Sequence, residues 1–341
     1  MAKTTMRTIA EKLGVSEMAV SFALRGGGRL STATRKRIID AAREMGYRPH
    51  AASRAMSSGR FNCIAMILST NVKYSDLQPQ VLLGIDDALR PQNYHLSLSH
   101  FPDDTLTNPK LAPKLLREWF ADGFIINYQF NAPEAMNKLI GEAQIPTVWL
   151  NTLQDTNAVR PDDELAGRML TEHLLMLGHT RIVYVDYSHP EDLKNEHYSA
   201  PARRAGYLKA MQAAGFESNT YHRGAHPVFD RVRMSMKWLT ESNRPTAVVC
   251  YSSQMAMAVI AAAHRLGMDV PNDLSVASID SRIHSLGPPL TTALLPSVEL
   301  GFESARMLLS MITAGVSTMP SMVIAPTIAA GGTTSPPSSL S

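Results

Sequence analysis

The chain has 341 residues, a formal net charge of +3 and two cysteines, and it has no run of ~18 uninterrupted apolar residues, which excludes a membrane-spanning helix. Its charge is unevenly distributed. Residues 1–60 hold twelve Lys and Arg against four Asp and Glu, a local charge of +8, whereas the remaining 281 residues hold 21 basic and 26 acidic side chains, a charge of −5. Clustered cations displace the counterions condensed on phosphates, so a small basic segment on a mildly acidic body indicates a nucleic-acid partner.

The basic segment has the pattern of three short helices. Residues 6–13 place their apolar side chains on one helical face, and Gly14 follows where a left-handed C-cap is favoured. Ser16 is a good N-cap for a second helix over residues 17–24, so the two helices and the tight turn between them predict a helix-turn-helix. After a run of three glycines, a third helix is predicted over residues 31–45.

This segment resembles the DNA-binding head of the lactose repressor family of bacterial transcription regulators. The matching residues are Ile9-Ala10, Leu13-Gly14-Val15-Ser16, Val20-Ser21, Ser31, Thr34-Arg35, Ile38, Ala41-Ala42 and Gly46-Tyr47-Arg48-Pro49. They specify the turn, the caps and the core together over about fifty positions. The alternative is a three-helix bundle with an incidental basic surface.

The resemblance implies that the second helix is a recognition helix in the major groove of DNA. Phe22 stands where many family members have an Arg that reads guanine, so it can only touch a thymine methyl or fill space. Arg25 stands where Asn is frequent, so Arg25 or Arg29 is expected to contact phosphate. These departures leave the operator sequence open. The expected DNA contacts are Arg7, Ser16, Glu17, Met18, Ser21, Phe22, Arg25, Arg29, Ser31, Thr34, Tyr47, His50 and Met56.

Residues 48–60 begin with Arg-Pro, end with Gly-Arg and have almost no apolar face. Alone, such a segment is too short to stay helical in water. It resembles the hinge of the family, which folds against its dimer mate when both meet the minor groove. Met56 then falls where the family uses a Leu as a wedge between base steps. An ordinary linker with a surface Met is the alternative.

From residue 62 onward, short apolar runs alternate with helical patterns. The predicted strands are residues 63–68, 122–126, 146–150, 181–185, 246–250 and 274–279. The predicted helices include residues 79–89, 163–177, 202–214, 227–239 and 253–266. Near-continuous apolar strands are typical of parallel sheets that are buried on both faces. The pattern therefore predicts an α/β fold with two doubly wound parallel sheets.

Some 280 residues are many for one such sheet, so we predict two lobes joined by crossing segments near residues 153–162 and 291–296, with a third pass near residues 321–325. The residues after 328 are poor in apolar side chains and lack the leucine heptads that would tie two dimers together, so a flexible tail and a homodimer are expected. The predicted parts are a helix-turn-helix head at 1–47, a hinge at 48–60, an effector-binding and dimerisation domain at 61–328 and the tail at 329–341.

The body of the chain resembles the effector domain of the same family, which is similar to periplasmic sugar-binding proteins. With the head included, the likeness spans nearly the whole chain. The supporting residues are Asp162-Asp163, Gly167-Arg168, His173-Leu174, Leu177-Gly178-His179, Arg203, Gly206-Tyr207, Pro245-Thr246-Ala247, Val270-Pro271, Asp280 and Pro288-Pro289-Leu290-Thr291-Thr292.

Ligands of such folds bind at the carboxyl ends of the parallel strands. The resemblance implies that Arg203, in an Arg-x-x-Gly-Tyr pattern, and Asp280 contact the effector. Neutral polar groups with one carboxylate and one guanidinium suit a polyhydroxylated ligand, although polar residues at strand ends are also common turn formers. The candidate effector contacts are Ser69, Thr70, Asn71, Asn127, Asn151, Arg203, Ser252 and Asp280.

The expected pocket is less acidic than is usual in the family. Members commonly have Asn-Asp where this chain has Ser252-Ser253, and Asp-Asp where it has Asp280-Ser281. The resemblance implies a sugar or sugar derivative as effector, and the loss of two carboxylates leaves a nucleobase or another non-sugar metabolite as the alternative.

An enzyme is a competing class. His222 and His226 have the four-residue spacing of two metal ligands on one helical face, but Gly224 lies between them, Pro227 follows and no third ligand is apparent. No nucleophile elbow, P-loop or dinucleotide fingerprint occurs. We therefore expect no enzyme activity, no metal and no cofactor.

A secreted solute-binding protein of the same fold is the second competing class. It would need an export signal, whereas the N-terminus begins with polar Lys3-Thr4-Thr5 and continues into a charged amphipathic helix. Cys63 and Cys250 each lie in a predicted buried strand, which indicates reduced core residues of a cytoplasmic protein.

The sequence thus predicts an allosteric transcriptional repressor. It is expected to bind a pseudo-palindromic double-stranded operator as a homodimer, with no membrane partner. An effector that closes the lobes would move the N-terminal lobes of the dimer and change the spacing of the hinge pair. Whether the effector releases or recruits DNA is left open by the sequence.

Overall fold

The computed structural model describes residues 4–47, 59–71, 74–108, 121–128, 134–188, 197–222, 227–282 and 289–338. The chain forms two compact units that meet in sequence between Phe61 and Asn62, and each is described by itself. The predicted hinge lies outside the described residues except for Gly59 and Arg60, and so do His50 and Met56.

In its described residues 4–47, the first unit is a bundle of three short helices, as predicted. Its helices are α1 (Met6–Leu13), α2 (Glu17–Arg25) and α3 (Thr32–Glu44). Each begins at a hydroxyl side chain that accepts a backbone hydrogen bond: Thr5 from Thr8, Ser16 from Ala19 and Ser31 from Thr34. The turn between α1 and α2 opens at Gly14, whose φ of 65° is the left-handed conformation that glycine adopts without strain.

The predicted core of this bundle is confirmed. Ile9, Val20 and Ile38 are fully buried, one from each helix, and they pack with Ala23 and Ala42. Met6, Leu13, Val15, Leu24, Leu30, Met45 and Tyr47 close the edges of this cluster. The charged side chains remain outside it, so folding the head leaves its basic surface exposed to solvent.

The second unit contains two six-stranded sheets, and the predicted α/β class is confirmed. The first sheet has the order β11-β5-β4-β3-β1-β2 and is parallel throughout. The second has the order β12-β10-β9-β8-β6-β7 and is parallel except for β12. The strands are β1 (Cys63–Ser69), β2 (His95–Phe101), β3 (Gly123–Asn127), β4 (Thr147–Leu150), β5 (Ala158–Pro161), β6 (Ile182–Asp186), β7 (Asn219–His222), β8 (Ala247–Cys250), β9 (Ser275–Asp280), β10 (Thr291–Leu294), β11 (Met322–Ile324) and β12 (Thr327–Ala329).

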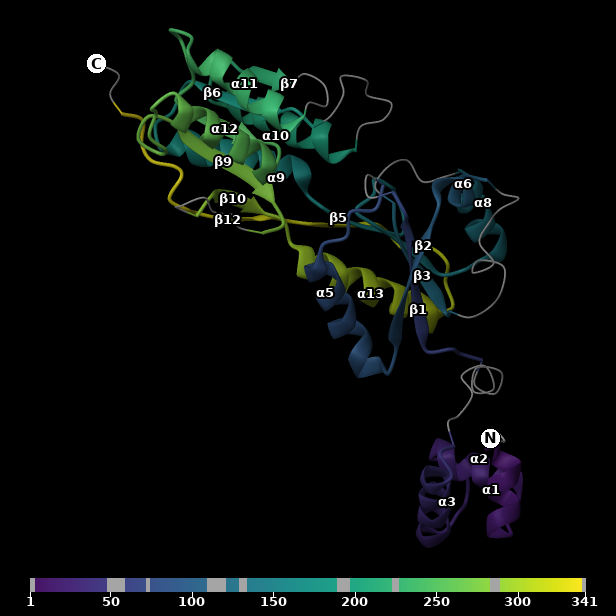
Figure 1. Cartoon of the computed structure of the whole chain (residues 1–341). Coiled ribbons are helices and arrows are strands. Elements are labelled where there is room, and N and C mark those ends of the chain that lie inside the picture. The colour runs from purple at the N-terminus through teal and green to yellow at the C-terminus, as the bar shows by residue number, and fades with distance from the viewer. Residues whose placement is uncertain are drawn as a thin grey trace. The chain divides into compact units, whose positions relative to one another are not determined.

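Helices pack against both sheets (Figure 1). Among the described residues of the first lobe they are α5 (Pro79–Leu89), the short turn η1 (Arg90–Gln92), α6 (Asp103–Thr107), α8 (Glu134–Ala143) and α13 (Ser297–Ala314). In the second lobe they are α9 (Asp163–Met176), α10 (Ser199–Ala213), α11 (Val228–Leu239) and α12 (Ser253–Arg265). The chain passes between the lobes after β5, after β10 and between β11 and β12. Within the described ranges, no helix is both long and apolar enough to cross a bilayer.

The C-terminal segment corrects one expectation. We predicted a flexible tail from residue 329, but residues up to 338 lie against the second lobe. Thr333 is 3% exposed, and its hydroxyl donates to Val276 O at 2.7 Å. The backbone N–H of Ser335 donates to Ser275 Oγ at 3.0 Å, and Ser335 O accepts from the His179 ring at 2.8 Å. This segment is held by hydrogen bonds, which the hydrophobicity of the sequence does not reveal.

The buried imidazole beneath this segment makes stability depend on pH. His179 is 2% exposed, and burial lowers its pKa below the ordinary 6.5. The unfolded chain then binds a proton at a higher pH than the folded chain does, so stability is retained above pH 6.5 and falls below it by about 1.4 kcal/mol per pH unit. We expect urea midpoints measured from pH 7.5 to 5.5 to fall less steeply in His179→Gln than in the exposed control His264→Gln. Equal slopes would contradict a neutral buried His179.

Candidate nucleic-acid interface and ligand cleft

The caps of the head use several of the predicted DNA contacts. Ser16 Oγ accepts from Ala19 N at 3.1 Å. Ser31 Oγ accepts from Thr34 N at 3.1 Å and lies 2.8 Å from Thr34 Oγ1. These hydroxyls therefore fix the first turns of α2 and α3, and the N-terminus of a helix favours a phosphate.

The outward face of α2 carries the other predicted contacts. Glu17 and Met18 are exposed, and Met18 is 65% exposed. Arg25 folds back along the helix: its Nη2 donates to Ser21 Oγ, and its Nε donates to Ser21 O at 3.3 Å. Ser21 is therefore already hydrogen-bonded in the free head, and Arg25 supplies the positive charge of this face. The remaining predicted contacts Arg7 and Arg29 are exposed, and Tyr47 is half-buried.

Phe22 packs on the glycine loop that follows α2. A Cβ placed on Gly28 would lie 2.6 Å from Phe22 Cγ, and Gly28 has a φ of +74°, so only glycine fits beneath the ring. Arg35 ties the same loop to α3 by donating to Phe22 O at 3.2 Å and to Gly27 O at 3.1 Å. Phe22 therefore fills space against the loop, and 37% of it remains exposed for an apolar contact.

A cleft of about 890 Å³ lies at the carboxyl ends of strands from both sheets. Five predicted effector contacts line it: Asn127, Asn151, Arg203, Ser252 and Asp280. Its lining also includes Asp76, His197, Ser199, Arg231 and Arg282, which we did not predict. Most of these five residues lie just before a helix, at its first turn or just after a strand. The sequence signal that could have identified them is therefore a predicted helix start that lies next to a predicted strand end.

Three predicted contacts are not among the lining residues. Ser69 Oγ donates to Asp103 at the start of α6 and accepts from Asn71 N at 2.9 Å. Thr70 N donates to Phe101 O at 2.9 Å. Ser69, Thr70 and Asn71 thus form the turn after β1, which was the alternative interpretation of polar residues at strand ends.

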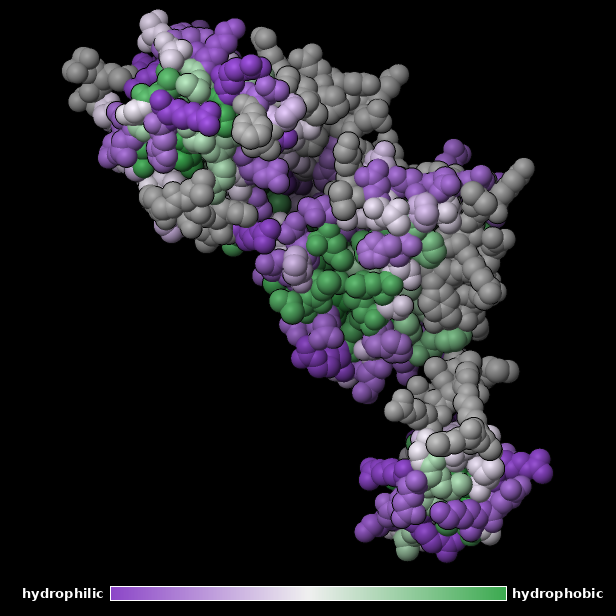
Figure 2. Space-filling model, in the orientation of Figure 1, coloured by the Kyte–Doolittle hydropathy of each residue, from purple (hydrophilic) through white to green (hydrophobic). Residues whose placement is uncertain are grey.

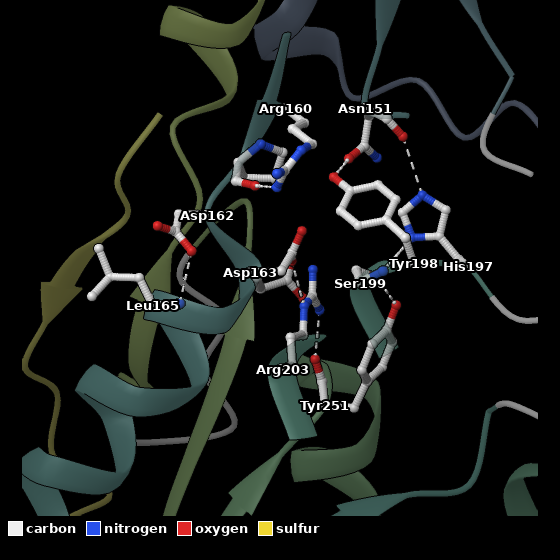
Figure 3. A network of polar contacts seen from close by, with 12 residues as sticks. Asn151, Arg160, Asp162, Asp163, Leu165, His197, Tyr198, Ser199, Arg203 and Tyr251 are labelled. Atoms are coloured by element: carbon white, nitrogen blue, oxygen red, sulfur yellow. Dashed lines mark hydrogen bonds and ion pairs between the residues drawn. The ribbon is translucent and has the colours of Figure 1, made fainter. Parts of the chain in front are cut away.

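Arg203 forms a buried ion pair beneath the cleft (Figure 3). Its Nε lies 2.8 Å from Asp163 Oδ1, its Nη1 donates to Tyr251 O at 2.7 Å, and its guanidinium lies 4.4 Å from the centre of the Tyr251 ring. Burial by itself lowers the pKa of Arg203, but the Asp163 carboxylate more than offsets that effect, so its pKa is raised and the side chain stays charged.

A close approach of α9 and α10 places this pair. A Cβ on Gly167 would lie 2.1 Å from Arg203 O, and a Cβ on Gly206 would lie 2.0 Å from Glu164 O. We expect Gly167→Ala to force the helices apart and destabilise the protein by about 1–3 kcal/mol in urea denaturation. Gly141→Ala is the matched control, because nothing lies within 4 Å of the added methyl. That helical substitution should be neutral or stabilising by up to about 1 kcal/mol. Equal effects of the two changes would contradict the close packing.

Asp280 caps a helix at the cleft wall. Its Oδ2 accepts from the backbone and hydroxyl of Ser253, the first residue of α12, and its Oδ1 accepts from Ser281 N at 2.7 Å. The carboxylate thus stabilises the N-terminus of α12 in the free protein.

A network of polar contacts connects the two lobes at Asn151 (Figure 3). Tyr198 OH donates to Asn151 Oδ1 at 2.8 Å, and His197 Nε2 lies 3.2 Å from Asn151 O. His197 Nδ1 lies 2.7 Å from Ser199 Oγ, which lies 2.9 Å from Tyr251 OH, and Arg203 binds the carbonyl of that same Tyr251. Asn151 on the first lobe is thereby linked to the buried ion pair on the second.

Asn127 has an unsatisfied acceptor at the cleft. The residue is 1% exposed, and its Nδ2 donates to Asp76 O at 3.2 Å. Its Oδ1 is buried and has no hydrogen-bond partner among the described residues. A buried acceptor of this kind costs free energy unless a donor is supplied, so the site favours a ligand with a hydroxyl or amine.

In the described part of the chain, no cluster of three or more His, Cys, Asp or Glu side chains could hold a metal ion. His226 lies outside the described residues, and so does Gly224. Both cysteines are buried and unpaired, and burial raises the pKa of Cys250.

Comparison with known proteins gives two family matches. The family described as bacterial regulatory proteins, lacI family, matches residues 5–50, and the periplasmic binding protein-like domain matches residues 171–334. The chain is 29% identical over 325 residues to the HTH-type transcriptional regulator DegA of Bacillus subtilis (strain 168), covering 89% of this chain and 90% of that protein. It is 25% identical over 315 residues to the HTH-type transcriptional repressor PurR of Aliivibrio salmonicida (strain LFI1238), covering 90% and 92%.

Among solved structures, the fold is similar to that of the lac repressor dimer bound to operator and the anti-inducer ONPF. The TM-score is 0.79 at 22% identity, over 98% of this chain and 100% of the other.

Proposed function

We propose that this chain is a homodimeric repressor whose operator affinity is set by a small polar effector. The chain belongs to the lactose repressor family, and it is a DNA-binding transcriptional regulator and not an enzyme. The observation that carries this proposal is the capped helix-turn-helix of residues 5–47 on the same chain as a polar cleft. A repressor that acts on DNA works in the cytoplasm of a bacterial cell, which agrees with two unpaired buried cysteines.

A second copy of the chain is proposed to bind through an apolar surface of the first lobe. Figure 2 shows hydrophobic residues gathered over α5 and α13. The large apolar side chains exposed on these helices are Leu83, at 62%, Val298, at 41%, and Phe302, at 38%. Exposed apolar clusters on a folded protein mark interaction sites. The solved relative is itself titled a dimer bound to operator, and a twofold operator requires two heads.

The cleft is proposed to hold the effector between the lobes. Asn127, Asn151, Arg203, Ser252 and Asp280 remain the proposed contacts, because they line it and present hydrogen-bonding groups. The effector would favour one arrangement of the two lobes, which the Asn151 network joins. In the dimer, that arrangement would change the spacing of the hinge pair and so the affinity for operator. Met56 remains the proposed wedge of a hinge between residues 48 and 60.

The test is a selection of duplexes from a random DNA library by the full chain. We expect an enriched pseudo-palindrome and a complex that contains two chains per duplex, measured by light scattering. Leu83→Asp places a charge in the proposed dimer surface and is expected to reduce operator affinity at least tenfold while the chain stays folded. The control Val316→Asp changes an exposed residue that follows the Gly315 C-cap of α13, and this variant should bind as the unmodified chain does. Failure of the unmodified chain to enrich any sequence would refute the proposed function.

A further inference from the structure

Two large apolar side chains are exposed in the described residues 4–47 of the head, and both lie on α2. Met18 is 65% exposed and Phe22 is 37% exposed. They are four residues apart, a spacing that places two side chains next to each other on one face of a helix. A single exposed apolar residue is ordinary on a protein surface. Here a pair forms an apolar patch on the helix that enters the major groove in a helix-turn-helix.

The rest of the outward face of α2 lacks the groups that read guanine. Glu17 is exposed, Ser21 is half-buried, and residues 17–24 include no Lys or Arg. Guanine presents two acceptors in the major groove, and its usual partner is an Arg or Lys that donates to both. In this motif the N-terminal residues of the second helix reach the base edges. The part of α2 that reaches them therefore lacks the usual partner of guanine.

Arg25 is the first cation of α2, and it lies at the C-terminal end of the helix. Its Nη2 donates to Ser21 Oγ and its Nε donates to Ser21 O at 3.3 Å, so its side chain runs back along the helix. Its position at the far end of α2 suits a phosphate contact, as the sequence led us to expect, and not the reading of bases by the first turns.

The ring of Phe22 is held in place in the free head. The loop after α2 passes so close to it that a Cβ added to Gly28 would lie 2.6 Å from Phe22 Cγ. Arg35 fixes that loop by donating to Gly27 O at 3.1 Å and to Gly28 O at 3.3 Å. A ring that is already fixed loses little conformational freedom when it contacts a base, which favours its use in recognition.

Thymine is the base that offers an apolar group to such a patch. Its 5-methyl group lies in the major groove, whereas adenine, guanine and cytosine present donors and acceptors there. An apolar patch that covered those polar edges would remove them from water without a hydrogen bond, at a cost in free energy. The carboxylate of Glu17 has only acceptors, so it can pair with the amine of cytosine or adenine and disfavours the acceptors of guanine.

We infer that the operator half-site under α2 is read through thymine methyl groups, which contact Met18 and Phe22, and not through guanine. The exposed apolar patch makes the favourable contact, and the lack of a cation in residues 17–24 removes the usual alternative. This inference rests on the proposed function and narrows its DNA target from an unspecified pseudo-palindrome to one with thymine at the contacted steps.

The experiment uses the operator that the full chain selects from the random library. Each thymine is replaced by uracil, which lacks the 5-methyl group but pairs in the same way, one position at a time and symmetrically in both half-sites. We expect at least one position at which affinity, measured by fluorescence anisotropy, falls by about fourfold for each methyl lost, or about fifteenfold for the symmetric pair. Replacing guanine by 7-deazaguanine, which lacks the N7 acceptor, should change affinity by less than about twofold.

Variants locate the methyl contact, because uracil also changes base stacking. Met18→Ala and Phe22→Ala should each remove the uracil penalty at one position, so that the variant binds the thymine and uracil operators equally. A head that was merely loosened by Phe22→Ala would bind both operators more weakly and leave their ratio unchanged, so the ratio reports the contact and not the fold. Met176→Ala changes an exposed side chain of α9 in the second unit and should keep the full penalty.

Three results would overturn the inference: no thymine position with a penalty above about twofold, a larger loss with 7-deazaguanine than with uracil, or a full uracil penalty in both head variants. If the chain selects an operator but gives one of these results, readout by the apolar patch is wrong and the repressor remains. If it selects no sequence, the proposed function fails and the inference fails with it.

Discussion

Replacing Arg203 by Met is expected to lower the free energy of unfolding of the second unit by about 3–5 kcal/mol. The substitution removes the cation that faces Asp163, which is 1% exposed, and leaves its carboxylate charged in a desolvated site. Urea denaturation of the full chain, followed by far-ultraviolet circular dichroism, measures the effect. Asp163→Asn should be destabilising for the converse reason, since it leaves the guanidinium of Arg203 buried without its counter-charge.

The double variant Arg203→Met with Asp163→Leu distinguishes the unpaired charge from lost packing. Removing both charges leaves neither uncompensated, so most of the lost stability should return. Lys209→Met is the matched control on the same helix pair, because it breaks the ion pair of Lys209 with Glu164 at 2.6 Å, where both side chains are largely exposed. That pair is worth about 0.5 kcal/mol. If Arg203→Met cost no more than Lys209→Met, the buried pair would not have the role given to it here.

The sequence predicted the head almost completely, because its determinants are local. The caps at Ser16 and Ser31, the left-handed Gly14 and the apolar periodicity of Ile9, Val20 and Ile38 all act within a few residues of the structure that they specify. What the sequence could not show is that Phe22 contacts Gly28, which depends on the path of the loop after α2.

The doubly wound body was predicted from its central strands, which are apolar on both faces. The edge strand β2 was missed because its Leu residues alternate with Ser and His, and most of its residues are only half-buried. The long helix α13 was also missed, although its apolar spacing and Gly315 C-cap were visible in the sequence. The C-terminal segment was misjudged because Thr333 and Ser335 are held by hydrogen bonds.

The sequence predicted only part of the cleft, because some of its residues are placed there by contacts between segments that are distant in sequence. A residue that follows a strand is easily recognised, and Asn127, Asn151, Ser252 and Asp280 were found in that way. Whether such a residue faces a ligand or closes a turn depends on contacts with distant segments, as for Ser69 and Asp103. Arg231 lies within a helix, and its place at the cleft follows from packing that no local pattern reveals.

Raising the salt concentration from 50 to 200 mM is expected to weaken operator binding by a factor of about 10³–10⁵, if the dimer neutralises roughly 6–10 phosphates. The head supplies the cations for this. Arg29 is exposed and makes no hydrogen bond or ion pair with the described residues, whereas Arg7 lies 3.0 Å from Glu11 and Lys12 lies 4.0 Å from Glu44. Arg29 therefore has less to lose than either of these when it binds a phosphate. Fluorescence anisotropy of a labelled operator across this range measures the slope of log affinity against log salt.

Arg29→Gln tests whether that slope comes from the head. In a symmetric dimer it removes two phosphate contacts, so the slope should become shallower by about 2, with affinity falling for specific and nonspecific duplexes alike. Arg265→Gln leaves the head unchanged and should keep the full slope. Because phosphate contacts carry no sequence information, the preference of Arg29→Gln for operator over random DNA should not change. A salt-independent affinity of the unmodified chain would remove the electrostatic basis for DNA binding by the head. An unchanged slope in Arg29→Gln would show that cations other than Arg29 contact the phosphates.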